Sequence, residues 1–155
     1  MKHRNHSLTS LTILSAIVLL GGCSSGPVIE GPVGALSQIR MQVDGDPEGK
    51  ARGAFPSGTT TVWCAFHLHS SLADAVDRYS LNVVDSSGNS LAQVVILEEE
   101  SITNAGSMVI GGPTTPYKVT VPIELEDGSF ADGEYRLQVM HNELCIATLP
   151  WSVGN

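Results

Sequence analysis

The sequence predicts an all-β fold, an antiparallel sandwich of seven to eight short strands. Apolar and polar residues alternate with the period of two that half-buried strands require, and turn-forming residues interrupt this alternation every eight to twelve residues. Beyond the N-terminal region, no segment shows the apolar period of a long amphipathic helix. These observations favour a sandwich over a barrel or an α/β fold.

The N-terminus has the features of an export signal. Lys2 and Arg4 give it a basic start, and residues 11–20 form an apolar run. A bilayer-spanning helix needs about 20 apolar residues, so this run has the length of a signal core instead. No second apolar run of membrane length follows. We therefore expect residues 1–22 to be a signal peptide that is removed on export.

The segment Leu20-Gly21-Gly22-Cys23 resembles a bacterial lipobox, in which an aliphatic residue and two small residues precede a lipidated cysteine. The resemblance implies that Cys23 carries a diacylglycerol and an acylated amine. It also implies a protein of the bacterial cell envelope, anchored by this lipid to the outer or the cytoplasmic membrane, with its domain outside the cytoplasm. The alternative is an ordinary secretory signal, with Cys23 an incidental thiol.

Residues 23–36 are rich in Gly and Pro and lack periodicity, so we expect a flexible tether there and a folded domain over residues 37–155. The whole chain has a net charge of −8; without Lys2 and Arg4, six Lys and Arg residues oppose sixteen Asp and Glu residues, which gives −10. Phosphate backbones and anionic headgroups repel such a chain. Nucleic acid is therefore not an expected partner, and membrane attachment falls to the lipid.

Eight segments have strand character. They are residues 39–43, 59–68, 79–84, 91–97, 107–110, 117–125, 132–139 and 144–153. The segment 59–68 is the richest in β-branched and aromatic residues. Its alternation places Val62, Cys64, Phe66 and Leu68 on a core face. The opposite face receives Thr61, Trp63, His67 and His69.

The last two predicted strands are the most diagnostic. Tyr135, Leu137 and Val139 alternate on one inward face, and Cys145, Ala147, Leu149, Trp151 and Val153 on the next. Residues 54–153 resemble the immunoglobulin-like or fibronectin-type domains of bacterial surface proteins in two places. One is the aromatic strand after the turn 56–58, and the other is the segment 132–137, which opens a final hairpin that ends at residues 151–153.

The resemblance implies an immunoglobulin-like sandwich with Tyr135 in the position of a tyrosine corner. The chain departs from the antibody pattern in two respects. Leu137 stands where the second cysteine of that pattern would be, two residues after the tyrosine, and Trp63 neighbours the first cysteine, Cys64, instead of lying on the following strand.

Lipidation of Cys23 leaves Cys64 and Cys145 as a pair in an exported, oxidising setting. The alternation turns both thiols toward the core, which predicts a structural disulfide between them. Closing a loop of about 80 residues would stabilise the fold by roughly 4 to 5 kcal/mol in the loop-entropy model. The alternative is two separate buried thiols that pack as small apolar groups.

The acidic segment 44–49 imitates the first half of an EF-hand calcium loop. Phe55 stands at the twelfth position, where a bidentate glutamate is needed, so we expect a solvated acidic turn. Residues 98–100 are three glutamates, expected to be a solvated strand end that discourages edge-to-edge pairing.

No motif for nucleophilic catalysis, phosphate binding or zinc hydrolysis occurs, so neither a catalytic residue nor a cofactor is expected. The leading hypothesis is a non-catalytic binding or structural module for an envelope protein or glycan. Trp63, His67 and His69, on the non-core face of the strongest strand, are the candidate binding face. The alternative is that residues 70–77 cover this face.

A second hypothesis is a periplasmic lipoprotein that binds copper or zinc. His67 and His69 would offer two ring nitrogens on one strand face, and His141, beside Met140, could add a third ligand. Two surface histidines without a metal are the alternative. Cys64 lies on the opposite side of its strand and cannot easily join this set.

Overall fold

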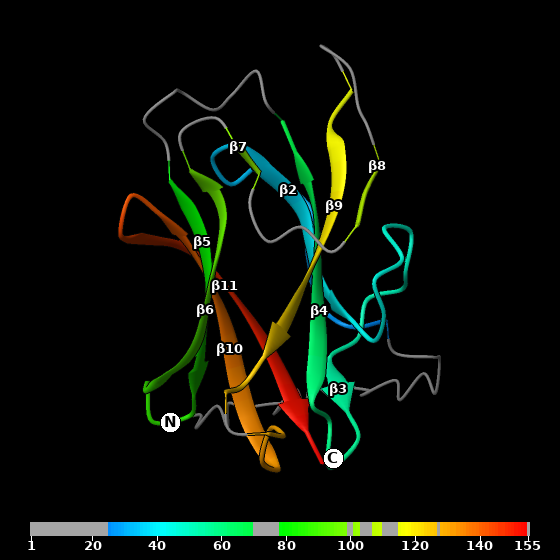
Figure 1. Cartoon of the computed structure of the whole chain (residues 1–155), viewed down its shortest axis with the longest axis vertical. Coiled ribbons are helices and arrows are strands. Elements are labelled where there is room, and N and C mark those ends of the chain that lie inside the picture. Colours follow the sequence, from blue (N-terminus) through cyan, green and yellow to red (C-terminus); the bar gives the residue numbers. More distant parts are fainter. Residues whose placement is uncertain are drawn as a thin grey trace, which may run out of the picture.

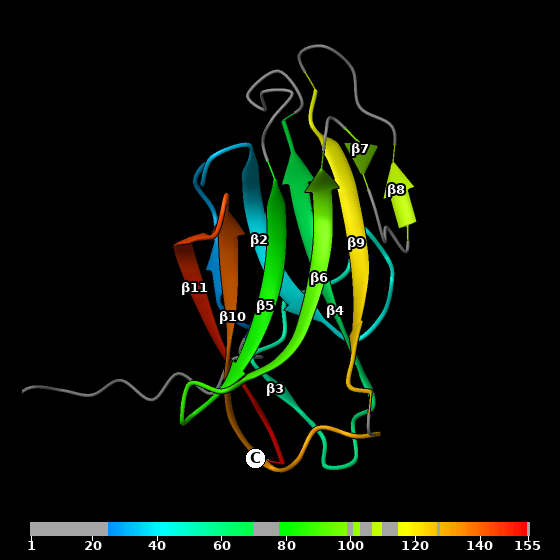
Figure 2. The same ribbon diagram turned by 60° about the vertical axis from the view of Figure 1, so that its left-hand side comes forward.

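The computed structural model describes residues 25–69, 78–98, 101–102, 107–109, 115–126 and 128–154. These residues form two β-sheets that face each other (Figure 1 and Figure 2). No helix occurs within these ranges, and so none that could cross a bilayer. The prediction of an all-β fold is confirmed for this part of the chain.

Sheet A has five strands, in the order β1 (Val28–Ile29), β2 (Leu36–Gln42), β4 (Thr61–Leu68), β9 (Tyr117–Glu124) and β8 (Ser107–Val109). Sheet B has six, in the order β3 (Ala54–Phe55), β11 (Leu144–Val153), β10 (Gly133–His141), β5 (Tyr79–Asp85), β6 (Ser90–Glu98) and β7 (Ser101–Ile102). All strand pairs are antiparallel except β3 with β11, which is parallel.

The hydrophobic core lies between the sheets and takes alternate side chains from both. β4 contributes Val62, Cys64, Phe66 and Leu68, none more than 3% exposed. β10 contributes Tyr135, Leu137 and Val139, and β11 contributes Leu149, Trp151 and Val153. The alternation predicted for β4, for β10 and for the second half of β11 is confirmed.

All eight predicted strands are present, with ends that differ from the predicted ones by at most three residues. The structure adds three strands that the sequence does not reveal: β1, β3 and β7. Each contains only two residues, and two residues cannot display a period of two. These short strands form only through pairing with longer neighbours.

The flexible tether predicted over residues 23–36 is corrected from Gly26 onward. The N–H of Gly26 donates to the carbonyl of Ala51 at 3.0 Å, and β1 then pairs with β2. A Cβ on residue 26 would lie 2.1 Å from the carbonyl carbon of Arg52, so a glycine is required for this approach. The Gly and Pro content reflects close packing here, and the folded domain begins before residue 37.

An aromatic cluster closes one end of the core. Tyr135 stacks on Trp151 with ring centroids 4.7 Å apart, while Phe130 packs edge-on against both rings and Phe55 edge-on against Trp151. The Tyr135 hydroxyl donates to the carbonyl of Ala131, four residues upstream, at 2.6 Å. A tyrosine hydroxyl that returns to the backbone just before its strand is the bond of a tyrosine corner.

The predicted disulfide between Cys64 and Cys145 is absent, and both cysteines are free. Cys64 is buried as predicted, but Cys145 is exposed. The physical reason is a bulge in β11: Val139 pairs with Ala147 and Met140 pairs with Cys145, so two steps along β11 match one step along β10. The extra residue inverts the alternation and turns Cys145 to the outer face of sheet B.

Candidate functional site

Trp63, His67 and His69 lie on one side of sheet A, away from sheet B, and each is half-buried. Trp63 and His67 are on β4, and His69 follows its last residue directly. The Nε2 atom of His69 lies 2.8 Å from the Ser37 hydroxyl on neighbouring β2. The three predicted residues therefore share one face.

Residues 43–53, which we name the covering loop, fold over this outer face of sheet A (Figure 1). Gln42 and Thr120 belong to the outer face, yet both are 0% exposed. The Thr120 hydroxyl donates to the carbonyl of Gly45 at 3.0 Å. A Cβ on residue 45 would come within 3.0 Å of the Trp63 ring, so glycine lets the loop lie against the indole.

Side chains of β2 hold the covering loop by its carbonyl groups. The Arg40 guanidinium donates to two of them, at 2.9 and 2.7 Å, and the Gln42 amide to two more, both at 2.7 Å. These acceptors are the carbonyls of Gly49, Pro47, Asp44 and Asp46. An ion pair between Lys118 of β9 and Glu48 adds a contact from the other side. The acidic side chains Asp44, Asp46 and Glu48 are exposed, as expected of a solvated turn, while the backbone of the segment is fixed onto the sheet.

The same contacts direct the oxygen atoms of the loop to protein donors. Asp44 Oδ1 accepts from the N–H of Asp46 at 3.1 Å, and Asp46 Oδ1 accepts from the N–H of Glu48 at 2.9 Å. Glu48 is paired with Lys118, and Arg40 and the Gln42 amide take the carbonyls. Among the described residues, the loop included, no three His, Cys, Asp or Glu side chains lie close enough to hold a metal ion.

The candidate binding face is corrected in this respect: its centre is covered by the chain itself. The segment that covers it is residues 43–53, of which residues 44–49 were expected to form a solvated acidic turn. The alternative cover, residues 70–77, lies outside the described residues. What remains accessible of Trp63, His67 and His69 is their half-buried outer edge, so the face offers a partner little surface.

His67 lies in a cationic environment. Its pKa is below the ordinary histidine value because burial disfavours the charged ring, and because Arg40, Lys118 and His69 repel an added proton. Glu48 acts in the opposite direction. The environment that keeps the ring neutral would equally disfavour a bound metal cation.

The three histidines of the metal hypothesis are not brought together. His141 lies on sheet B, where its ring stacks on Tyr79 with centroids 4.5 Å apart, whereas His67 and His69 lie on or beside β4 of sheet A. Within the ranges that the structure describes, no three His, Cys, Asp or Glu side chains are close enough to hold a metal ion. The metal hypothesis thereby loses its third ligand.

The outer face of sheet B carries a different arrangement. Thr148, Gln138, Asn82 and Gln93 occupy directly paired positions on β11, β10, β5 and β6, and we name these four residues the polar row. The Asn82 amide donates to Gln138 Oε1 at 2.9 Å, and the Ser90 hydroxyl donates to Asn82 Oδ1 at 2.6 Å. Gln93 and Thr148 are exposed, and no described segment crosses this face of β10, β5 and β6 (Figure 2).

A small pocket adjoins the polar row. It has a volume of about 130 Å³ and is lined by Arg78, Ser80, Gln93, Met140 and Glu143. Gln93 Nε2 donates to the Ser80 hydroxyl at 3.2 Å, and Ser80 is only 5% exposed. Because Gln93 belongs to both sets, the pocket and the polar row form one continuous surface.

The β10–β11 turn builds one wall of this pocket. Asn142 and Glu143 both have positive φ angles, 47° and 72°, as the two central residues of a type I′ hairpin turn do. Asn142 is tied to Arg78 by two hydrogen bonds of 2.9 Å, one from its N–H to the Arg78 carbonyl and one from the Arg78 N–H to its side-chain oxygen. These bonds fix the turn, and with it Glu143, beside the pocket.

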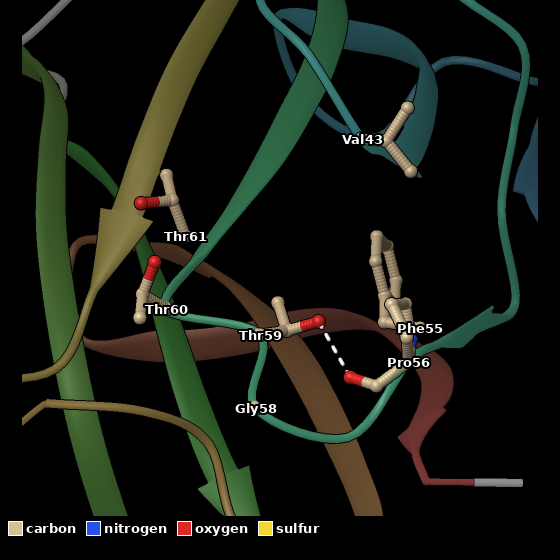
Figure 3. Close-up of a pocket in the computed structure, with 7 residues that line it drawn as sticks. All are labelled: Val43, Phe55, Pro56, Gly58, Thr59, Thr60 and Thr61. Atoms are coloured by element: carbon tan, nitrogen blue, oxygen red, sulfur yellow. Dashed lines mark hydrogen bonds between the residues drawn. The ribbon is translucent and has the colours of Figure 1, made fainter.

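A second, larger pocket lies between the covering loop and the start of β4 (Figure 3). Its volume is about 310 Å³. It is lined by Val43, Phe55, Pro56, Gly58, Thr59, Thr60 and Thr61. The Thr59 hydroxyl donates to the carbonyl of Pro56 at 2.7 Å, across the turn drawn in Figure 3. No acidic or basic side chain lines this pocket, so it supplies no general acid or base.

Sequence reasoning missed the polar row and its pocket. The alternation within each segment shows that Asn82, Gln93 and Gln138 point away from the core. It does not show that β5, β6 and β10 are neighbours, nor that these residues are in register. The available signal was chemical: amide side chains, instead of charged ones, at the outward positions of three predicted strands.

Comparisons with known proteins add little to this picture. No family model and no curated protein matches the chain. Among solved structures, the chain is similar to the alkylpurine DNA glycosylase AlkC of Pseudomonas fluorescens bound to DNA containing an abasic site analog, with 10% sequence identity and a TM-score of 0.31. The match covers 76% of this chain and 30% of that one. Similarity at this level assigns no activity to the chain.

Proposed function

We propose that the chain is a lipid-anchored protein of the bacterial cell envelope whose β-sandwich is a non-catalytic binding or structural module for a protein or glycan partner. The lipobox-like residues 20–23 support the lipid anchor. The acidic composition supports attachment by lipid alone, because an acidic surface is repelled by anionic headgroups. The two packed sheets support a module whose role lies in its surfaces.

The strand order supports an immunoglobulin-like form of the sandwich. The order β2-β4-β9-β8 corresponds to A-B-E-D, and β11-β10-β5-β6 corresponds to G-F-C with an added C′ strand. β3 follows β2 in the chain but pairs with β11 of the other sheet. The Tyr135 hydroxyl bond at the start of β10, the strand in the place of F, is a further point of agreement.

One observation favours the outer face of sheet B as the binding surface. The outer face of sheet A is closed by the covering loop, whereas no described segment covers the polar row on sheet B, and its central side chains are already held by hydrogen bonds. Side chains that are ordered before binding lose less conformational entropy when a partner arrives. The open face therefore replaces the Trp63, His67 and His69 face as the favoured contact surface.

Crosslinking and capture from native membranes tests this assignment. We expect the wild-type chain to be crosslinked to a partner, and the double variant Asn82→Ala, Gln138→Ala to lose at least about nine-tenths of that product, since each lost hydrogen bond contributes about 1 kcal/mol. Circular dichroism would show that the variant folds.

The matched control is Thr61→Ala, Glu124→Gln. This pair removes an exposed side-chain hydrogen bond of 2.9 Å between the first residue of β4 and the last residue of β9 in sheet A, and leaves sheet B unchanged. The control is expected to capture as well as the wild type. Equal loss in both variants, or no loss in the sheet B variant, would contradict the assignment.

A further inference from the structure

We propose that the polar row and the adjoining pocket bind a neutral glycan, with the pocket receiving one sugar ring edge. This inference rests on the proposed function, because it names the class of partner for the same face. The evidence is the hydrogen-bonding capacity of the surface, its charge and its dimensions.

The surface offers donors and acceptors together. Gln138 accepts a hydrogen bond with its side-chain oxygen, and Ser80 accepts one with its hydroxyl oxygen. Within the described part of the chain, the two N–H groups of the Gln138 amide and the O–H of Ser80 have no acceptor and are available to a ligand. Gln93 uses only its nitrogen, which leaves its oxygen as an acceptor. A hydroxyl group can donate and accept at once, so a polyhydroxylated ligand matches this mixture.

Charged ligands match it less well. A carboxylate or phosphate group only accepts hydrogen bonds, so it would leave the Gln93 oxygen without a donor. It would also be repelled by the chain, whose net charge is −10 once Lys2 and Arg4 are removed. A cation would meet a cationic residue, Arg78, among the five residues that line the pocket. The pocket balances one cationic residue, Arg78, with one anionic residue, Glu143, and the polar row has no charge.

The dimensions suit an extended chain of sugars. Neighbouring strands are about 4.8 Å apart, so the four residues of the polar row span about 14 Å across β11, β10, β5 and β6. The pocket beside the row has a volume of about 130 Å³, room for about four water molecules at about 30 Å³ each. A ligand seated there would place one ring edge over Ser80 and Met140 and extend along the row.

The test is side-chain amide NMR on the full lipidated chain in nanodiscs, titrated with maltohexaose, cellohexaose and chitohexaose. The anionic comparison ligand is hexagalacturonate. We expect at least one neutral hexaose to shift the amide signals of Asn82, Gln93 and Gln138 and hexagalacturonate to leave them in place. Gln93→Glu, which keeps the side-chain shape at an exposed position, is expected to weaken that binding at least about tenfold.

Thr61→Ala serves as the control and is expected to bind like the wild type. The inference is overturned if no neutral hexaose shifts these amides, or if hexagalacturonate shifts them equally. If the Asn82→Ala, Gln138→Ala variant loses a crosslinked protein while no glycan binds, the face serves a protein and only this inference fails. If neither partner depends on the face, the proposed function fails as well.

Discussion

Cys64 and Cys145 show how much one inserted residue changes a side chain's environment. Burial raises the pKa of Cys64 to about 12, so almost no thiolate forms at neutral pH, and the core also blocks access. Cys145 is exposed on the outer face of sheet B. With iodoacetamide, the folded lipidated chain is therefore expected to gain one adduct, at Cys145, by peptide mass spectrometry.

After unfolding in denaturant without reductant, the same chain is expected to gain two adducts, because the proposed lipidation would occupy the Cys23 sulfur. The variant Cys145→Ser should gain none when folded and one when unfolded. Failure of both cysteines to react before reduction would indicate a disulfide and contradict the structure. A third adduct would show that Cys23 is a free thiol.

His67 gives a prediction for pH. The folded protein holds this ring neutral more strongly than the unfolded chain does, because its folded-state pKa is lowered by burial and by Arg40, Lys118 and His69. As pH falls through the unfolded-state value of 6.5, the unfolded chain binds the proton first, so the free energy of unfolding decreases. Above that value this contribution is fully present.

Urea unfolding at about pH 7.5 and about pH 5.5 measures the effect, since the two values bracket the ordinary histidine pKa. We expect His67→Gln to lose less stability than the wild type over this range, because glutamine does not titrate. Carboxylates, which titrate at lower pH than histidine, contribute equally to the pH dependence of unfolding in both proteins. Their contribution therefore cancels when the two proteins are compared. Identical pH dependence in the two proteins would argue against the environment described for His67.

At the scale of strands, the immunoglobulin-like form predicts which core positions lie opposite each other. In that fold, strands B and F are joined by a disulfide whose second cysteine follows the corner tyrosine by two residues. Here β4 carries Cys64 and β10 carries Leu137 two residues after Tyr135, and both side chains are 0% exposed. Leu137→Cys is therefore expected to form a disulfide with Cys64 under oxidising conditions.

Leu137→Cys is introduced into a chain that already carries Cys145→Ser, so that Cys145 cannot form a disulfide with either of the other two cysteines. Closing a loop of about 73 residues stabilises by roughly 4 kcal/mol in the loop-entropy model, against a loss of a few kcal/mol for the smaller side chain. Leu137→Ser supplies that loss alone as a control. Mass spectrometry of the unreduced chain reads out the bond, and two free thiols after full oxidation would count against the immunoglobulin-like arrangement.

The sequence predicts those elements whose pattern is local. The alternation of β4, from Val62 to Leu68, is set by residues two apart and was predicted correctly. The bulge in β11 was missed because it depends on how Cys145 pairs with Met140 across a hairpin. The covering loop was missed for a similar reason, since Arg40 and Gln42 hold it by hydrogen bonds to its carbonyls, and any residue in the loop has a carbonyl.

For the whole molecule, the early start of the fold limits the distance to the membrane. Gly26 is already bonded to Ala51, and three residues of chain reach at most about 11 Å. If Cys23 carries the lipid, the sandwich is held close to the bilayer surface and not on a long tether. Under the proposed anchoring, many copies held on one membrane would act together, and weak individual contacts with a partner would gain avidity.

The anchor itself is the last prediction. Each buried acyl CH₂ contributes about 0.8 kcal/mol, so two or three chains would hold the protein on a membrane despite the net charge of −10 that remains once Lys2 and Arg4 are removed. We expect the full chain to fractionate with membranes and its mature N-terminus to be an acylated Cys23 by intact mass.

Cys23→Ser alone could stay attached through an uncleaved signal, so the informative variant joins Cys23→Ser to a secretory signal that is cut directly before residue 23. That variant should leave the membrane fraction while keeping its fold. A variant that stays with membranes would place the attachment elsewhere, and a wild-type N-terminus at another residue would favour the ordinary secretory signal.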